Sequence, residues 1–133
     1  MTNSCLADTS AVLAYLEGNL RVLAIFNQSD KVYVPAIVAG ELYVGVEKCR
    51  NPIKEEMKVS EFLSMTQLLH VDHGTALIYA KIVHQLDSDG MRIPSNDSWI
   101  AALGMQYDTP VISLDQHFQR IQSLPLHSIT KKD

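Results

Sequence analysis

The sequence predicts an α/β fold, a three-layer α/β/α sandwich around a parallel sheet of about five strands. Two observations predict this class. Short apolar runs alternate with longer segments of helical periodicity along the whole chain, an order typical of parallel strands joined by helices. The length of 133 residues, with no repeat, low-complexity run or linker, fits one compact domain. We therefore expect residues 1–133 to form a single domain.

The first half of the chain carries two expected strands and four expected helices. In order, they are a strand over residues 4–8, helices over 11–16 and 20–27, a strand over 32–34, and helices over 36–49 and 53–66. Gly18-Asn19 interrupts the first helical run, and Pro35 stops the second strand. Pro52 begins the fourth helix, because proline is compatible with a first helical turn.

The second half carries three more strands and three more helices. In order, they are a strand over residues 68–71, helices over 74–86 and 99–107, a strand over 110–114, a short helix over 116–123 and a strand over 126–129. The turn residues Asp87-Ser88-Asp89-Gly90 end the long helix, and Ser95 or Asn96 is expected to cap the next one. That next helix is apolar on nearly all sides, which predicts a buried position.

Composition and charge exclude several classes of protein. The net charge of −4 does not indicate a nucleic-acid-binding surface, but it permits one, because eleven acidic residues face eleven lysines and arginines once the four acids described below are set aside. The apolar segments are too short and too often interrupted to span a membrane, and Met1-Thr2-Asn3 does not begin a secretory signal. Cys5 and Cys49 have neither a metal-ligand spacing nor a disulfide pattern, so we expect reduced thiols and a cytoplasmic location.

Four acidic residues stand where a strand ends or where a neighbouring helix begins. Asp8 closes the first strand and Asp115 follows the fourth, while Glu41 lies one helical turn beyond the second strand. Asp97 opens the helix that leads into the fourth strand. Helices begin at the carboxyl edge of a parallel sheet, so the four carboxylates are expected to converge there. Such carboxylates repel one another unless a cation neutralises them, and hard oxygen ligands favour Mg²⁺ or Mn²⁺. The sequence thus predicts a metal-dependent phosphoryl-transfer site.

Each aspartate alone also fits a structural role. Asp8 and Asp115 could cap the helices that follow them, and Asp97 could interact with the dipole of its own helix. Glu41 gains little from capping, since it lies past the first turn and borders an apolar stripe, where a carboxylate needs a partner charge or a metal. Glu41 therefore favours the metal site. The five histidines are scattered, without zinc-ligand spacing on one helix. His117 follows Asp115 closely and could contact substrate, but we interpret it as a solvated helix residue.

Four segments resemble the PIN-domain nucleases. They are Leu6–Leu13, Glu41–Gly45, Asn96–Ala102 and Ile112–Phe118. Within that family the chain is similar to the VapC-type toxins of toxin–antitoxin pairs, and the similarity extends from the first acid to the last strand. Ser113 stands where many members carry threonine, which keeps a hydroxyl at that point. The resemblance implies a Mg²⁺- or Mn²⁺-dependent endoribonuclease that cleaves RNA, a homodimer, and a small cognate antitoxin of the VapB type as partner.

The chemistry of this site assigns roles to the acids. Asp8 and Asp97 are expected to be direct ligands of a first metal, and Glu41 and Asp115 to complete its shell or to bridge to a second metal. Whether one or two metals bind stays open. Other residues are expected to orient the ligands or a water molecule from behind. These residues are Thr9, Ser10, Asn96 and Ser113.

Two other functions stay open at this point. An aspartate after a first strand can act as a nucleophile, as in receiver-like phosphotransfer domains, which would want a lysine at a later strand end. The fourth strand ends instead in Leu114-Asp115, which disfavours this alternative. The second alternative is a PIN domain that binds without catalysing, and the loss of an acid would favour it. None of the four acids is lost.

Overall fold

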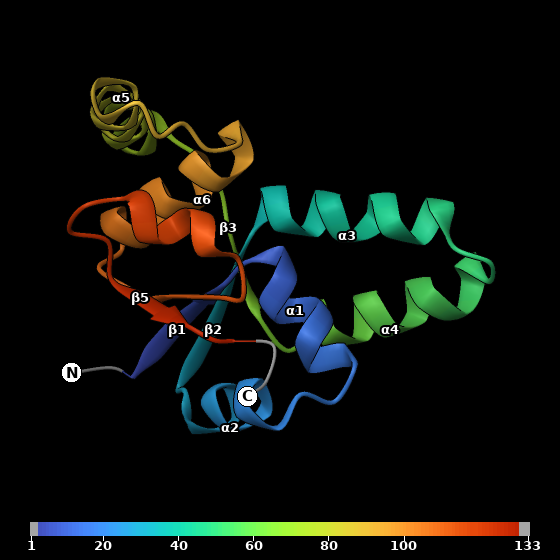
Figure 1. The fold of residues 1–133 in the computed structure, drawn as a ribbon. Helices are drawn as coiled ribbons and strands as arrows, with labels where there is room; N and C mark the ends of the chain where they lie inside the picture. Colours follow the sequence, from blue (N-terminus) through green and yellow to red (C-terminus); the bar gives the residue numbers. More distant parts are fainter. Residues whose placement is uncertain (1–2, 131–133) are drawn as a thin grey trace.

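The structure is a computed structural model that describes residues 3–130 and contains one five-stranded parallel sheet (Figure 1). Residues 1, 2 and 131–133 of the expected domain lie outside the described residues. The strands are β1 (Ser4–Ala7), β2 (Lys31–Pro35), β3 (Gln67–Leu69), β4 (Val111–Ser113) and β5 (Leu126–Ser128). The helices are α1 (Thr9–Leu16), α2 (Leu20–Gln28), α3 (Ala36–Lys48), α4 (Pro52–Ser64), α5 (His73–Asp89), α6 (Ser95–Gln106) and the 3₁₀ helix η1 (Gln116–Arg120).

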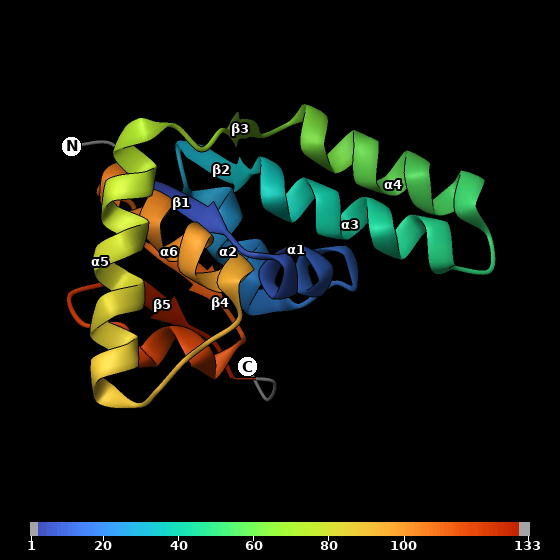
Figure 2. The ribbon, with the colours of Figure 1, turned by 90° about the horizontal axis from the view of Figure 1, so that it is seen from above.

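The helices lie in two layers, one on each face of the sheet. The strand order is β3-β2-β1-β4-β5 and all neighbouring strands are parallel. Since parallel crossovers are right-handed, α1 to α4 cover one face, while α5, α6 and η1 cover the other (Figure 1; Figure 2). Aromatic contacts within each layer agree with this division of the helices. Tyr15 of α1 stacks on Phe26 of α2, and Tyr79 of α5 stacks on Trp99 of α6. The predicted three-layer sandwich is confirmed.

The α3 and α4 helices run side by side and extend away from the sheet (Figure 2). Asn51 caps α4 by accepting a hydrogen bond from the Lys54 N–H at 3.3 Å, and Pro52 begins the helix as predicted. The Tyr43 and Ser60 hydroxyls lie 3.2 Å apart and join the two helices. This pairing holds α3, which carries Glu41, in place beside the sheet.

The core lies around β1, the middle strand, and its neighbour β4. Leu6 and Val111 have no exposed surface, and the α6 residues from Ile100 to Leu103 are 0–1% exposed. The predicted burial of this helix is confirmed. Gly104 lets α6 approach β4 closely, since a Cβ atom at this position would lie 2.7 Å from Val111 Cγ2.

The long helix α5 ends later than predicted. It continues through Asp89 instead of ending at Leu86. Gly90 ends the helix, because it adopts the left-handed conformation with a φ of 66° and its N–H bonds back to the last turn. The last turn of α5 therefore accommodates Asp87 and Asp89, and Gly90 marks the C-terminal end of the helix.

Two other helices in the second half also differ from the prediction. Pro94 is the N-cap of α6 and makes no side-chain cap bond, so the expectation that Ser95 or Asn96 caps this helix is wrong. Proline fixes the extended backbone that leads into the helix, which begins directly after it. The helix expected over residues 116–123 is a shorter 3₁₀ helix, and the chain takes a positive φ of 62° at Ser123.

Between residues 3 and 130, no single helix is long and apolar enough to cross a membrane. The α1 and α2 helices reach the required length and apolarity only together, and the chain bends by 107° between them. Their side chains Val12, Val22 and Phe26 belong to the buried core.

We expect Gly104→Ala to lower the free energy of unfolding by about 1–3 kcal/mol, because the added methyl group overpacks the contact between α6 and β4. The matched control is Gly45→Ala in α3, where a Cβ atom would meet nothing within 4 Å. That variant should gain about 0.5–1 kcal/mol from helix propensity. Urea unfolding of both variants measures the difference. Equal effects of the two substitutions would contradict the close approach at Gly104.

Candidate metal centre

The fold brings the four predicted acidic residues to one edge of the sheet. β1 and β4 are parallel neighbours, so Asp8 and Asp115 leave the sheet at the same edge. Asp97 lies in the first turn of α6, and Glu41 lies in the second turn of α3. An open cavity of about 460 Å³ is lined by Glu41, Asp97 and Asp115, and its remaining lining comes from residues 94–96.

Two serine hydroxyls tie Asp8 to the end of β4. The Ser113 hydroxyl donates to Asp8 Oδ2 and accepts a hydrogen bond from the Asp115 N–H at 2.8 Å. The Ser10 hydroxyl donates to Asp8 Oδ1 at 2.7 Å and accepts from the Leu114 N–H at 3.0 Å. Each hydroxyl therefore bridges a backbone N–H of the segment after β4 to one oxygen of the carboxylate.

Asp8 is buried, with 4% of its surface exposed. Its Oδ1 atom also accepts a hydrogen bond from the Ala11 N–H at 2.8 Å and so caps α1. Burial raises the pKa of Asp8 from 3.8 to about 6, although the hydrogen bonds from Ser113, Ala11 and Ser10 oppose the rise. The negative charge of Asp97 adds a smaller increase. The capping role and the place in the acidic cluster therefore coexist in this residue.

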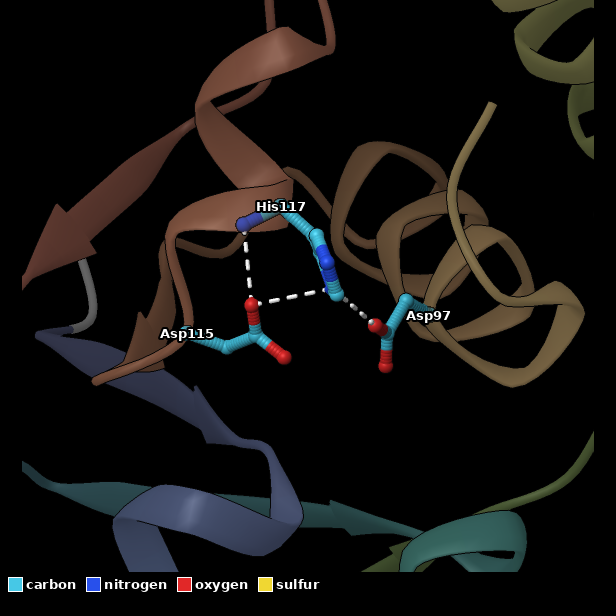
Figure 3. A group of neighbouring side chains, drawn as sticks. All are labelled: Asp97, Asp115 and His117. Atoms are coloured by element: carbon cyan, nitrogen blue, oxygen red, sulfur yellow. Dashed lines mark hydrogen bonds and ion pairs between the residues drawn. The ribbon is translucent and has the colours of Figure 1, made fainter. Parts of the chain in front are cut away.

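Asp97, Asp115 and His117 form a tight group (Figure 3). His117 Nδ1 lies 3.0 Å from Asp115 Oδ1 and 3.4 Å from Asp97 Oδ2. Burial and then the charge of Asp115 raise the pKa of Asp97, with a smaller contribution from Glu41, while His117 lowers it. His117 lies in a helix and is partly exposed, as interpreted from the sequence, but its ring also faces two carboxylates, a contact that this interpretation did not include. The sequence signal was its position two residues after Asp115.

Glu41 is half-buried and is held by α1. The Thr9 hydroxyl, at the start of that helix, donates to Glu41 Oε1 at 3.0 Å. Thr9 thus contacts an acid of the cluster, as expected of a residue that orients a ligand, and the two serines contact Asp8 in the same way. Asn96 lines the cavity, but within residues 3–130 its side chain forms no hydrogen bond with the four acids.

Cations are scarce around this cluster. Within the described residues, no lysine or arginine lies at salt-bridge distance from Asp8, Glu41, Asp97 or Asp115. The repulsion among the carboxylates is therefore offset only in part, by His117 and by neutral hydrogen-bond donors. The set of oxygen donors around the cavity fits a divalent cation such as Mg²⁺ or Mn²⁺. The receiver-like alternative gains no support, because none of the lysines between residues 3 and 130 pairs with Asp8.

Comparison with known proteins places the chain in a family. The PIN domain profile matches residues 5–124. The chain belongs to the PIN domain family. Within this family it is 30% identical over 136 residues to a protein named Ribonuclease VapC from Rickettsia bellii, a match that covers 96% of this chain and 98% of the relative. This PIN domain is therefore a member of the VapC group.

Solved structures of similar proteins share the fold. The structure of DNA-bound VapBC from Salmonella typhimurium superimposes with a TM-score of 0.87 at 21% identity, covering 96% of this PIN domain and 98% of that chain. A Mycobacterium tuberculosis structure, described as a member of the VapBC family of toxin-antitoxin systems, has a TM-score of 0.75 at 26% identity, with coverages of 96% and 98%. The three-layer architecture is thus that of a VapC-type PIN domain.

The raised pKa of Asp8 makes stability depend on pH when divalent metals are absent. An acid whose pKa is higher in the folded chain binds its proton more tightly there, so its contribution to stability grows as the pH falls from above 6 toward 4. In a chelating buffer, we expect the free energy of unfolding to rise by on the order of 2 kcal/mol between about pH 7.5 and about pH 5. Urea unfolding across this range measures it.

The control for this experiment is Asp8→Asn. Its amide oxygen can still accept the Ala11 N–H, but the side chain no longer titrates, so most of the increase at low pH should disappear. The variant should also be more stable than the wild type at about pH 7.5, because the buried charge is gone. A wild type that loses stability as the pH falls through this range would contradict the raised pKa.

Proposed function

We propose that this PIN domain is a metal-dependent endoribonuclease that acts as the toxin of a toxin–antitoxin pair. The observation that carries the proposal is the convergence of four carboxylates at one edge of the sheet, three of them lining an open cavity, without a lysine or arginine among residues 3–130 at salt-bridge distance to neutralise them. The name Ribonuclease VapC of the Rickettsia bellii relative supports RNA as the substrate. The toxin-antitoxin description of the Mycobacterium tuberculosis structure supports the biological context.

In the proposed mechanism, the chain's own groups hold the ligands and position the substrate. Asp8 and Asp97 would hold the metal, and Glu41 and Asp115 would complete its shell or bridge to a second ion. When bound, a divalent metal lowers the pKa of a coordinated water and stabilises charge on the scissile phosphate. Thr9 keeps one oxygen of Glu41 oriented through its hydroxyl bond, which leaves the other oxygen available in the cavity.

The surface around the acids offers room for a polynucleotide. Asp115 lines the 460 Å³ cavity and also a larger open hollow of about 900 Å³, to which Ser10 and α1 contribute. An RNA strand that crosses both hollows would pass directly over Asp115. Because the site is negative, the phosphate backbone would approach only after a cation has bound there. RNA binding near the site should therefore depend on metal as well as on salt.

The partner in this proposal is a small antitoxin of the VapB type. Several large apolar side chains of the first four helices are exposed, among them Leu20, Val44, Ile53 and Met57. Exposed apolar side chains often mark protein interfaces. We therefore assign them to contacts with the antitoxin or with a second copy of the chain in a homodimer. An antitoxin that directs an arginine or lysine at the four acids would neutralise them and exclude metal at once. An RNA-cleaving toxin of this kind works in the cytoplasm.

Cleavage of RNA by the purified chain should require a divalent metal. An excess of chelator should abolish cleavage, and Mg²⁺ or Mn²⁺ should restore it, since carboxylates bind these ions through oxygen. Asp97→Asn and Glu41→Gln should each lower kcat/KM by about 100-fold or more. The matched control is Glu56→Gln, which changes an exposed glutamate of α4 and should cleave like the wild type.

Two outcomes would contradict the metal-site proposal. The first is undiminished cleavage in excess chelator. The second is a Glu41→Gln variant that unfolds at a lower temperature and yet keeps full specific activity after correction for its folded fraction. In that case Glu41 would stabilise α3 against α1, and the aspartates would keep only their capping roles.

Expression of the chain in bacteria without an antitoxin should stop growth within a few generations. Expression of Asp97→Asn should not, because that variant keeps the fold and lacks one ligand. Sequencing of RNA ends shortly after induction measures the cleavage directly and identifies the target. Normal growth combined with metal-dependent cleavage in vitro would assign the chain to RNA maintenance instead, and a failure of both would favour a PIN domain that only binds.

A further inference from the structure

His117 brings a nitrogen base into the cluster of carboxylates. Its Nδ1 atom lies 3.0 Å from Asp115 Oδ1 and 3.4 Å from Asp97 Oδ2 (Figure 3). One ligand atom from each of the three residues lies within 4.8 Å of the other two. The imidazole therefore points into the space where the two carboxylates converge, from the 3₁₀ helix that directly follows Asp115.

These separations are those expected between neighbouring ligands of one metal ion. With metal–ligand distances of about 2.1 Å, adjacent ligands lie about 3.0 Å apart around an octahedral ion and about 3.4 Å apart around a tetrahedral one. A shared proton gives similar distances, so a metal can replace the proton with little movement of the imidazole relative to either carboxylate. In the metal-binding form of the histidine, Nδ1 would offer its lone pair to the metal and Nε2 would carry the only ring N–H proton.

The backbone fixes His117 in this position. Its N–H donates to Asp115 Oδ1 at 2.9 Å, which caps η1. The next residue, Phe118, has no exposed surface and anchors η1 in the core. The histidine ring is thus placed beside the carboxylates before any ion arrives, which lowers the entropic cost of ligation.

We propose that His117 Nδ1 is a ligand of the metal held by Asp97 and Asp115, and that this nitrogen makes the site prefer transition metals such as Mn²⁺ and Co²⁺ over Mg²⁺. The inference rests on the proposed function, in which Asp97 holds a metal and Asp115 completes its shell or bridges to a second ion. Mg²⁺ retains water and oxygen ligands, whereas imidazole suits first-row transition metals and binds them more strongly from Mn²⁺ to Co²⁺.

The test is calorimetric titration of the metal-stripped full chain, without RNA, with Mg²⁺, Mn²⁺ and Co²⁺ in separate experiments. We expect His117→Ala to weaken Mn²⁺ and Co²⁺ binding by about tenfold or more and to change Mg²⁺ binding by less than about threefold. The matched control is His84→Ala, which removes an exposed histidine of α5 and should leave all three affinities unchanged. The visible spectrum of bound Co²⁺ should also change in His117→Ala relative to the wild type. It should stay the same in His84→Ala.

Other outcomes would overturn the inference. If the imidazole is only a counter-cation, its removal will strengthen the binding of all three metals. Equal weakening of all three metals would show a disturbed carboxylate pair and no nitrogen ligand. His117→Gln keeps a polar side chain at this position and should show the same selective loss of affinity for Mn²⁺ and Co²⁺. It replaces His117→Ala in the test if that variant unfolds. A wild type that binds no divalent metal would overturn the proposed function itself, whereas normal binding with unchanged selectivity in both variants would overturn only the role of His117.

Discussion

The structure of the site depends on the two serine hydroxyls that join Asp8 to the end of β4. Where β4 ends, the N–H groups of Leu114 and Asp115 need acceptors, and the hydroxyls of Ser10 and Ser113 provide them. Each hydroxyl then directs its own proton at Asp8. A hydroxyl that both accepts and donates has little freedom to rotate. The geometry of the sheet edge is thereby transferred to a carboxylate that would otherwise be too costly to bury.

The same charges connect stability, metal binding and partners. The cluster concentrates negative charge in a chain whose net charge is −4, so the rest of the surface is close to neutral. Burial and mutual repulsion raise the pKa of Asp8 and of Asp97, which means that the metal-free fold carries a cost. Any cation that enters the cavity lowers this cost. The negative charge of the cluster can therefore be neutralised by a metal ion, by a basic side chain of a partner or by a proton, and these three compete with one another.

The parallel order and the convergence of the acids could be predicted because both follow from local signals. Asp8 and Asp115 each follow an apolar run, and a right-handed parallel topology then brings such strand ends to one edge. The environment of His117 could be predicted only in part. Its position two residues after Asp115 is a local signal, but its contact with Asp97 joins residues that are twenty positions apart and on different helices. The start of α6 was also missed, because the backbone of Pro94 replaces the side-chain cap that the local rule expects.

The candidate site takes its side chains from all three layers of the sandwich, so its geometry depends on how closely the layers pack. Asp8 and Asp115 leave the sheet, Glu41 comes from the α1–α4 face, and Asp97 and His117 come from the opposite face. The position of Asp97 therefore depends on the distance between α6 and the sheet. That distance is set near the other end of α6, where a glycine allows the helix to contact β4. A residue without a functional group thus helps to determine the separation of the carboxylates, because Asp97 and Gly104 belong to one continuous helix that packs on the sheet.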